Sequence, residues 1–447
     1  MNDNIIIVGA GPTGLTLGCL LQSQGINCVI LEKEQQQNQL TKAVMVHAAS
    51  LDVFSLLEID QAVLQKGLKQ NSIRFNIQGK EEYVMDFTQL SPNKFPFFIN
   101  IKQPDLVDIL ERKFTSLGGR VYYHHDVYQI GENGTVLAKN GDEDVEFIGS
   151  YIVGCDGAKS TVRKLAQIEY KGITYPYSYV LVEGVPRQSF PLDESQMHIS
   201  ENGAISVIPM GDNVFRVAGP GPRQDVGDLI NIEDFKKIMA SIGMGEFADF
   251  KKITSLRSYK VNERMAETLV KDRVVLCGDA GHIHSPTGGQ AMNLGIADAF
   301  CLYWRFAQTD ISQRQALLRE YTEERLTLAK YTVERTKLNP LIQKMNSGKV
   351  SKQELKKIML SFSQTAHAIQ VNSEKSLQTK SLKTGARIPN LRWHDTTTWR
   401  ELSGKTYTEI IPTGHGIGNI LADYFEQSVP CKIRFRQDFI ISSVEML

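Results

Sequence analysis

The amino-terminal part of the chain alternates short apolar runs with a helical pattern. Residues 4–8 and 28–31 are rich in β-branched and aliphatic side chains, and residues 15–24 between them have a helix-like pattern that Gly25 ends. A further apolar run covers residues 151–155. Short continuous apolar runs joined by helices are typical of buried strands in a parallel sheet. We therefore expect an α/β fold around a parallel sheet.

The middle of the chain has a different pattern. Short runs rich in β-branched and aromatic residues, separated by Gly and Pro, cover residues 72–76, 81–87, 177–184, 197–200, 204–209 and 213–218. This pattern predicts an antiparallel sheet. In the last run, Val214, Arg216 and Ala218 share one face, whereas Phe215 and Val217 share the other. An arginine at mid-strand is either an edge residue that reaches solvent or a buried cation directed at a ligand.

The last third of the chain begins with a long helical pattern. Residues 313–338 carry apolar side chains at steps of three, four or seven, namely Leu317, Tyr321, Leu328, Tyr331 and Leu338. We expect an amphipathic helix there, with its charges on a solvated face, and a second helix over residues 352–367. The chain changes character again from residue 384 onward.

Length and composition narrow the class of protein. The chain has 447 residues, enough for about three domains. It is 42% hydrophobic and 22% charged, so it is neither disordered nor fibrous. Fifty Lys and Arg balance fifty Asp and Glu. Without a global basic excess, we expect no nucleic-acid partner.

The cysteines and the apolar runs indicate an intracellular environment. The six cysteines are scattered at Cys19, Cys28, Cys155, Cys277, Cys301 and Cys431. They form no C-x-x-C pair and no Cys/His cluster with zinc spacing, so we expect neither a disulfide scaffold nor a metal site. No run approaches the ~18 apolar residues of a membrane span, and no basic leader precedes the first strand. We expect a cytoplasmic protein.

The turn after the first strand predicts nucleotide binding. Residues 9–14 read GAGPTG, and Glu32 ends the second strand. This is the G-x-G-x-x-G arrangement of strand, glycine turn, helix, strand and acid. Gly9 permits the tight turn, Gly11 lets a pyrophosphate approach, and Gly14 allows close packing. The alternative is a glycine-rich turn in an ordinary βαβ unit. Glu32, which suits a ribose diol, favours a dinucleotide, but the turn alone does not distinguish FAD from NAD.

Two later motifs distinguish them. Residues 151–163 predict a strand, an Asp156-Gly157 turn and a helix start, and residues 273–282 predict a strand that ends at Gly278-Asp279. With the first motif, they resemble the class A flavoprotein monooxygenases, FAD-dependent aromatic hydroxylases that include para-hydroxybenzoate hydroxylase. In layout the chain is most similar to the rifampicin and polyketide hydroxylases. The resemblance runs from the amino terminus to about residue 338.

The resemblance implies three regions and a set of site residues. A Rossmann-like FAD-binding domain comprises residues 1–70, 101–175 and 268–345, an inserted substrate-binding sheet comprises 71–100 and 176–267, and a helical linker with a reduced thioredoxin-like region comprises 346–447. The implied contacts to non-covalent FAD are Gly9, Gly11, Pro12, Thr13, Gly14, Glu32, Lys33, Lys42, Gln103, Asp156, Gly157, Gly278, Asp279, Pro286, Gly288, Gly289, Gln290, Ala291, Met292 and Asn293. Arg216 and Pro286 are the implied catalytic residues.

Two positions depart from the family pattern. Lys42 stands where the family usually has an arginine, so it keeps the charge but loses the bidentate fork. Ala291 replaces a glycine near the flavin and adds a Cβ. We expect weaker cofactor affinity and restricted flavin movement from these changes.

Some residues keep two readings. Phe95, Phe97 and Phe98 line an aromatic pocket or belong to the core. His282 and His284 are core histidines or site residues, and we give them no catalytic role.

The resemblance implies an NAD(P)H- and O₂-dependent monooxygenase. In the family NAD(P)H reduces the flavin, O₂ adds at its C4a carbon, and the hydroperoxide transfers OH⁺ to an aromatic or polycyclic phenol-like substrate. NAD(P)H binds transiently, without a second nucleotide domain. The expected partners are thus the substrate and O₂, in a monomer or homodimer. The rivals are a flavin-dependent reductase on the same fold and an FAD protein that binds a polycyclic ligand without turnover.

Overall fold

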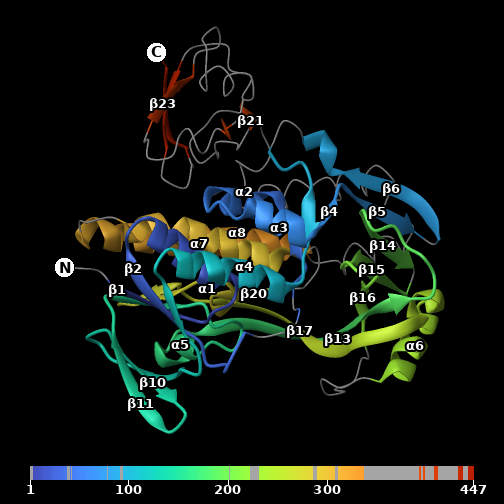
Figure 1. Ribbon diagram of the computed structural model, residues 1–447, viewed down its shortest axis with the longest axis horizontal. Helices are drawn as coiled ribbons and strands as arrows, with labels where there is room; N and C mark the ends of the chain where they lie inside the picture. The colour runs from blue at the N-terminus through green and yellow to red at the C-terminus, as the bar shows by residue number, and fades with distance from the viewer. Residues whose placement is uncertain are drawn as a thin grey trace.

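The computed structural model describes most of the chain up to residue 336. The described residues are 4–37, 41, 43–77, 79–90, 94–200, 202–221, 231–284, 289–307 and 311–336, together with five short strands nearer the C-terminus. The structure has two main sheets, and the long strands described below connect them (Figure 1).

The first sheet is the expected parallel one. Its strands, in spatial order, are β18 (Val270–Lys271), β19 (Val274–Leu276), β12 (Tyr151–Gly154), β1 (Asn4–Val8), β2 (Asn27–Leu31) and β8 (Arg120–Tyr122). All neighbouring pairs are parallel except β18 with β19. Strand β1 is buried from Ile5 to Val8, which explains its continuous apolar run.

Helices cover one face of this sheet, and a small sheet lies on the other. The covering helices are α1 (Pro12–Ser23), α4 (Gln103–Ser116) and α7 (Gln290–Phe306), of which α1 packs against both others. The opposite side carries α5 (Thr161–Leu165) and the antiparallel strands β9 (Asp126–Ile130), β10 (Thr135–Asn140) and β11 (Glu143–Ile148). The βαβ order therefore confirms the Rossmann-like prediction.

The second sheet has eight strands. In spatial order they are β20 (His282–Ile283), β17 (Phe250–Ala266), β13 (Tyr170–Pro186), β16 (Phe215–Pro220), β15 (Gly203–Pro209), β14 (Glu194–Ser200), β5 (Ser72–Ile77) and β6 (Lys80–Asp86). Strands β13 and β17 are each 17 residues long and run from beneath the helices into the distal half (Figure 1). The expected antiparallel pattern is wrong at one place, because β14 pairs with β5 in parallel.

The two faces of this second sheet differ. Helix α6 (Ile232–Ser241) packs on one face, where Phe215 and Val217 meet Phe235 and Met239 in an apolar cluster. This confirms the predicted division of strand β16 into two faces. The sequence patterns did not predict α6 or the length of β17.

The remaining short elements lie between these strands and helices along the chain. They are β3 (Met45–Val46), α2 (Ala48–Leu56), α3 (Asp60–Lys66), β4 (Leu68–Gln70), the 3₁₀ turn η1 (Phe87–Leu90), β7 (Phe98–Asn100), the 3₁₀ turn η2 (Gly245–Ala248) and the 3₁₀ turn η3 (Gly278–Ala280). Strands β3, β7 and β4 form a small antiparallel sheet.

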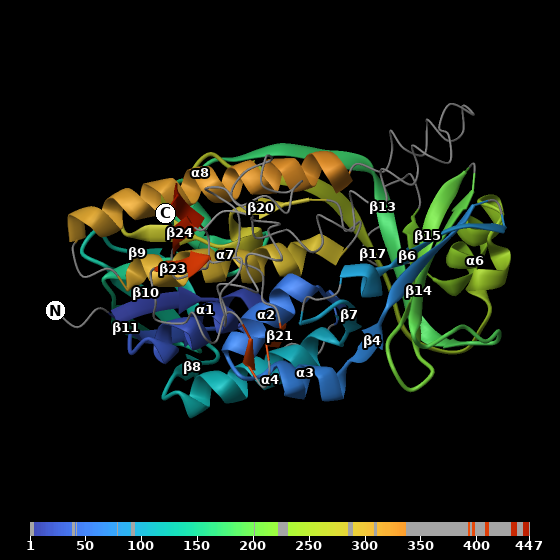
Figure 2. The ribbon, with the colours of Figure 1, turned by 90° about the horizontal axis from the view of Figure 1, so that it is seen from above.

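Helix α8 (Ile311–Thr336) corrects one expectation. It runs alongside α7, as Figure 2 shows from above. Its predicted apolar face is buried at Tyr321, Leu328 and Tyr331, whereas Leu338 lies outside the described residues. The charges do not form only a solvated face, because Arg314 and Arg325 are buried. Both arginine side chains therefore lie inside the protein rather than on its solvated surface.

The C-terminal prediction is largely outside the described residues. This holds for the expected helix over 352–367 and for most of the thioredoxin-like region. The described strands there are β21 (Arg392–Trp393), β22 (Thr396–Thr397), β23 (Tyr407–Ile410), β24 (Cys431–Phe435) and β25 (Ile441–Met446), the last three forming an antiparallel sheet. The described helices include none that is long and apolar enough to cross a membrane.

Candidate cofactor and active site

The three glycines of the turn between β1 and α1 have different surroundings. Two are closely packed against the protein, and one faces open space. Gly9 has a φ of +108°, and a Cβ there would lie 2.5 Å from the Cys155 carbonyl oxygen. A Cβ on Gly14 would lie 2.0 Å from the Gly9 carbonyl oxygen. At Gly11, by contrast, no atom of the described chain lies within 4 Å of a Cβ, apart from Gly11 and its two chain neighbours. Gly9 and Gly14 are thus required by the fold, whereas Gly11 faces open space.

The start of α1 can receive an anion. Gly11 is the N-cap residue and has no side chain to occupy the first N–H groups of the helix. Pro12 follows at the first helical position and is buried. Thr13 packs between two glycines, since a Cβ on Gly278 or Gly295 would approach its hydroxyl to 2.9 or 2.3 Å. Uncapped N–H groups at a helix N-terminus favour phosphate.

Glu32 lies beside this turn, as its motif predicts. One carboxylate oxygen accepts from the Ala10 N–H at 2.8 Å, and the other accepts from the Glu34 N–H at 3.0 Å. A carboxylate has about four acceptor positions, so Glu32 still has capacity for a ribose diol. Lys33 is exposed, and Lys42 lies outside the described residues.

Asp156 follows strand β12 by two residues and has one carboxylate oxygen engaged and one open. Its Oδ2 accepts from the N–H groups of Thr161 at 2.7 Å and Val162 at 3.1 Å. Its Oδ1 is buried and has no hydrogen-bond partner among the residues that the structure describes. Gly157 follows with a φ of +78° and open space at its Cα. A buried, unsatisfied acceptor is costly, so this carboxylate is suited to a donor from a ligand.

Arg163 connects the Asp156 turn to the Gly278 turn, and sequence reasoning assigned it no role. Its guanidinium donates to the carbonyl oxygens of Ala280 at 2.7 Å and Ala158 at 3.0 Å. It also stacks 3.7 Å above the Tyr170 ring, whose hydroxyl donates to the Asp279 carbonyl oxygen at 3.1 Å. Burial lowers the pKa of Arg163 and raises that of Tyr170. The only sequence signal for this role was the position of Arg163 at the end of the 151–163 motif.

The Gly278–Asp279 turn closes strand β19. Gly278 has a φ of +65°, and its N–H donates to Asp298 at 3.0 Å. Asp279 is the middle residue of the 3₁₀ turn η3 and is half-buried. Gly278 lies beside Thr13 at the start of α1, so Asp279 follows directly on a residue of this cradle.

The start of α7 supplies a further candidate contact. Gly289 precedes it with a φ of +62°, and the Oε1 of Gln290 is buried without a hydrogen-bond partner in the described part of the chain. Asn293 is different: its amide donates to Met45 and Gly289 carbonyls and accepts from His47 N–H and the Ser50 hydroxyl. Its side chain is fully used within the protein, so only its backbone is left for a cofactor.

The other predicted FAD contacts near α4 and α7 differ in burial, and two of them lie outside the described residues. The Oε1 of Gln103 accepts from the Ala43 N–H at 3.0 Å and so fixes the residue after Lys42. Met292 is buried and Ala291 is half-buried. Pro286 and Gly288 lie outside the described residues.

Arg216 lies in a buried ionic network. It is 4% exposed on a central strand, so the reading as a solvent-reaching edge residue is wrong. Its guanidinium donates to Glu183 on β13 and to the Thr41 carbonyl oxygen, the latter at 2.7 Å. Arg257 on β17 also donates to Thr41, at 3.0 Å, and lies 3.4 Å from Glu183. Burial lowers the pKa of Arg216, but Glu183 supports its charge.

The aromatic and histidine residues with two readings all lie in the interior. Phe95, Phe97 and Phe98 are buried, and the first two belong to the main apolar core. His282 and His284 are buried as well. The Nε2 atom of His282 is 2.6 Å from Asp298 Oδ2, so this histidine belongs to an interior polar cluster.

These parts meet at one edge of the parallel sheet. Strands β19, β12, β1 and β2 are neighbours in that order and run in parallel, so the loops after them share the carboxyl edge. Ligands of such sheets bind at this edge. The open cradle at Gly11 and the unsatisfied oxygen of Asp156 are features that a bound FAD would fill. The fold and site therefore define a dinucleotide-binding protein with a second sheet beside its site.

Comparison with known proteins identifies the family. The chain belongs to the FAD-binding domain family, whose sequence model matches residues 3–336. It is 29% identical over 350 residues to rifampicin monooxygenase of Rhodococcus hoagii, covering 75% of this chain and 70% of that protein. It is 27% identical over 359 residues to 12-dehydrotetracycline 5-monooxygenase/anhydrotetracycline 6-monooxygenase of Streptomyces rimosus, covering 76% and 70%.

Other relatives extend this comparison. Dialkyldecalin synthase of Streptomyces rugosporus is 27% identical over 341 residues, covering 73% of this chain and 70% of that protein. The solved anhydrotetracycline hydroxylase of Streptomyces rimosus has the same fold, with a TM-score of 0.74 and 22% identity over 100% of this chain and 96% of that chain. Aklavinone-11 hydroxylase, solved with FAD and aklavinone, also has a TM-score of 0.74, at 16% identity over 99% and 95%. The resemblance to FAD-dependent monooxygenases is confirmed, and FAD is the cofactor.

Proposed function

We propose that this protein uses NAD(P)H and O₂ to hydroxylate an aromatic or polycyclic phenol-like small molecule. The observation that carries the proposal is the convergence of three motifs at the carboxyl edge of β19, β12, β1 and β2, beside a second sheet. In the overall reaction, one oxygen atom enters the substrate and the other leaves as water. The names of the rifampicin and tetracycline relatives support a polycyclic substrate.

The cofactor-binding roles are divided among the turns. The N–H groups at the start of α1 would hold the pyrophosphate, Glu32 would accept from a ribose, and Asp279 would accept from the ribityl chain. Asp156, through its open Oδ1, would accept a further donor. When bound, FAD supplies the redox chemistry by taking electrons from NAD(P)H and activating O₂. The protein supplies orientation, charge and the exclusion of water.

The face of the second sheet opposite α6 is our candidate substrate wall. It carries Arg216 in register with Ile208, and Ala218 in register with Ser206, which in turn pairs with Met197. Ile208, Ser206 and Met197 are only half-buried, although they lie on central strands. Partly exposed apolar side chains opposite a covered face suit an apolar ligand.

We assign Arg216 a role between the two sheets. Together with Arg257 it holds the Thr41 carbonyl oxygen, and Ala43, two residues further on, donates its N–H to the predicted FAD contact Gln103. Arg216 would thus fix the substrate wall relative to the segment that contacts Gln103. Pro286 stays a proposed catalytic residue on the family pattern alone.

The wider setting is also proposed. The described residues contain a single parallel sheet, which supports a transient NAD(P)H site rather than a second nucleotide domain. The five cysteines described with side chains are buried and form no disulfide bond with one another, which supports a cytoplasmic location. We propose a monomer or a homodimer.

A second candidate is an FAD protein that acts on a polycyclic ligand without inserting oxygen. The relationship to dialkyldecalin synthase favours it, because that name describes no oxygenation. Both candidates share the cofactor site, so cofactor content does not separate them.

Turnover under ¹⁸O₂ separates them. The holoenzyme is incubated with NADPH or NADH and a panel of phenolic polycyclic compounds, and product masses are measured. One labelled oxygen atom in a product supports the monooxygenase. A product without label would contradict the proposed oxygen insertion and support the second candidate or a reductase.

A further inference from the structure

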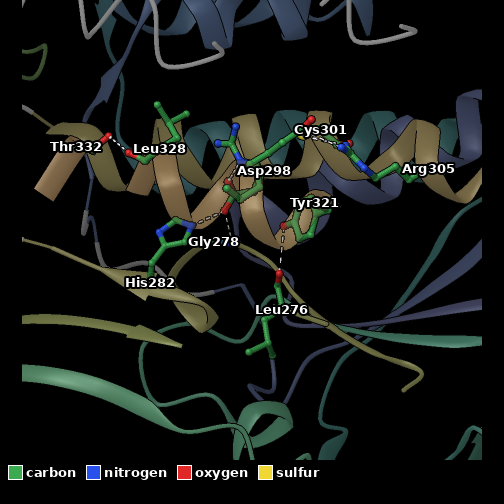
Figure 3. A network of polar contacts seen from close by, with 11 residues as sticks. Leu276, Gly278, His282, Asp298, Cys301, Arg305, Tyr321, Leu328 and Thr332 are labelled. Atoms are coloured by element: carbon green, nitrogen blue, oxygen red, sulfur yellow. Dashed lines mark hydrogen bonds and ion pairs between the residues drawn. The ribbon is translucent and has the colours of Figure 1, made fainter. Parts of the chain in front are cut away.

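A buried ionic cluster lies directly behind the Gly278–Asp279 turn. Asp298 on α7 is 0% exposed, and its partners His282 and Arg325 are each 2% exposed. The Arg325 Nε donates to Asp298 Oδ1 at 2.5 Å, and His282 Nε2 lies 2.6 Å from Oδ2. Figure 3 shows Asp298 at the centre of this cluster, pointing from α7 toward Gly278 and His282.

Asp298 keeps its charge despite complete burial. Burial alone favours the protonated carboxyl, but Arg325 and His282 together hold the pKa of Asp298 below its ordinary value. Arg325 in turn has its pKa raised by the Asp298 charge against the effect of burial. An ionised carboxylate makes stronger hydrogen bonds than a neutral group.

One of those bonds goes to the cofactor turn. The N–H of Gly278 donates to Asp298 Oδ2 at 3.0 Å, and Gly278 has the left-handed φ of +65°. The next residue is Asp279, so the orientation of this peptide determines where the Asp279 side chain starts. Helix α8 makes a second contact here, because the Tyr321 hydroxyl donates to the Leu276 carbonyl oxygen at 3.1 Å (Figure 3).

We infer that Asp298, held by Arg325 and His282, is a positioning residue that sets FAD affinity by fixing the Gly278–Asp279 turn. The inference rests on the proposed place of the Gly278–Asp279 turn in the FAD site. Through Arg325, helix α8 would contribute to cofactor binding, although none of the predicted FAD contacts lies on this helix. Asp298 acts through the turn and needs no contact with FAD itself.

The same pair of helices offers a matched control. Arg305 on α7 pairs with Glu324 on α8 at 2.7 Å, with the guanidinium fully buried. Arg305 also donates to the Leu317 carbonyl oxygen at 2.8 Å. None of the hydrogen bonds described for this second pair reaches the Gly278–Asp279 turn. A purely structural role predicts similar consequences for both pairs.

The test compares Asp298→Asn with Glu324→Gln. An amide has one acceptor oxygen, so in Asp298→Asn an NH₂ group faces either Arg325 or the Gly278 and His282 donors. Apoprotein is titrated with FAD while flavin fluorescence is followed, and the thermal midpoint of each apoprotein is measured. We expect both variants to lose thermal stability. Only Asp298→Asn should weaken FAD binding, by about tenfold or more.

Equal FAD affinity in the two variants would overturn the inference. If Asp298→Asn does not yield folded apoprotein, Arg325→Lys and Arg305→Lys form the second matched pair, with the same expectation for Arg325→Lys alone. Asp279→Asn is measured alongside. Normal binding by Asp298→Asn with weak binding by Asp279→Asn removes this inference only. Weak binding by Asp298→Asn with normal binding by Asp279→Asn keeps the positioning role and removes the proposed role of the Asp279 carboxylate.

Discussion

The two sheets of this protein present functional groups in different ways. At the carboxyl edge of the parallel sheet, the candidate FAD site consists largely of backbone turns, such as the open cradle at Gly11 and the start of α1. On the eight-stranded sheet, the candidate substrate wall consists of side chains from separate strands, joined by the contacts of Arg216, Glu183 and Arg257. The first arrangement is local in sequence, whereas the second depends on strand register.

This difference explains how each site responds to change. A backbone cradle has no side chain to remove, so it is blocked only by adding atoms. A cross-strand network fails when one partner is removed, because the remaining charges stay buried. The predictions below use both kinds of change.

The largest expected effect is on the packing glycine. In Gly14→Ala the new Cβ would lie 2.0 Å from the Gly9 carbonyl oxygen, so backbone must move. We expect a loss of about 3 kcal/mol or more in the free energy of unfolding of the apoprotein. Chemical denaturation without FAD measures it. An apoprotein as stable as the wild type would show that the turn is not packed as described.

A comparable but more specific effect is expected at Arg216. Arg216→Ala leaves Glu183 buried with only the more distant Arg257, so we expect about 3–5 kcal/mol of destabilisation. FAD should remain bound, while the product formed per NAD(P)H consumed falls.

Arg74→Ala is the matched control for Arg216. Arg74 forms an ion pair with Glu194 at 2.6 Å in the same sheet, with 31% of its side chain exposed. Its described hydrogen bonds go to Glu194, not to Thr41. The control should lose less stability and keep the wild-type product yield. Equal yields in the two variants would make Arg216 purely structural.

The smallest effect is a pH dependence at His198. Burial lowers the pKa of His198 from 6.5 to about 4, so the folded protein holds it neutral while the unfolded chain takes up a proton. Its contribution is intact above pH 6.5 and is lost as the pH falls toward 4. The His198 ring lies tilted against the Phe247 ring, with 4.3 Å between the ring centroids, and the residue is half-buried, so we expect a contribution of roughly 1 kcal/mol. Between pH 7 and 5, His198→Phe should lose less stability than the wild type; equal losses would contradict this assignment.

Much of the nucleotide half could be predicted from the sequence. The turns at residues 9–14, Asp156-Gly157 and Gly278-Asp279 are short motifs whose geometry follows from glycine and strand ends, and each lies where expected. Arg163 was missed because its two acceptors, Ala158 and Ala280, are far apart in the sequence.

The substrate half was predicted only in outline. The faces of strand β16 follow from its alternation, but the partners of Arg216 do not, because Glu183 and Arg257 reach it through the register of β13 with β16 and β17. The buried ion pairs of α8 were also missed because the partner residues lie on another element, helix α7. In the sequence, Arg325 stands among other charged residues of a helix, which is typical of a solvated face. Its ion pair with Asp298 depends on how α7 packs against α8, and the sequence of α8 alone does not show this packing.

The central claim is that the space at Gly11 belongs to FAD rather than to the fold. Gly11→Ala tests it most directly, with FAD affinity and apoprotein stability measured on the same preparation. Apart from its chain neighbours, no described residue comes within 4 Å of the added Cβ. We therefore predict an apoprotein unfolding free energy within about 0.5 kcal/mol of the wild type, with FAD binding weakened at least about tenfold. Unchanged FAD affinity in this variant would contradict the account.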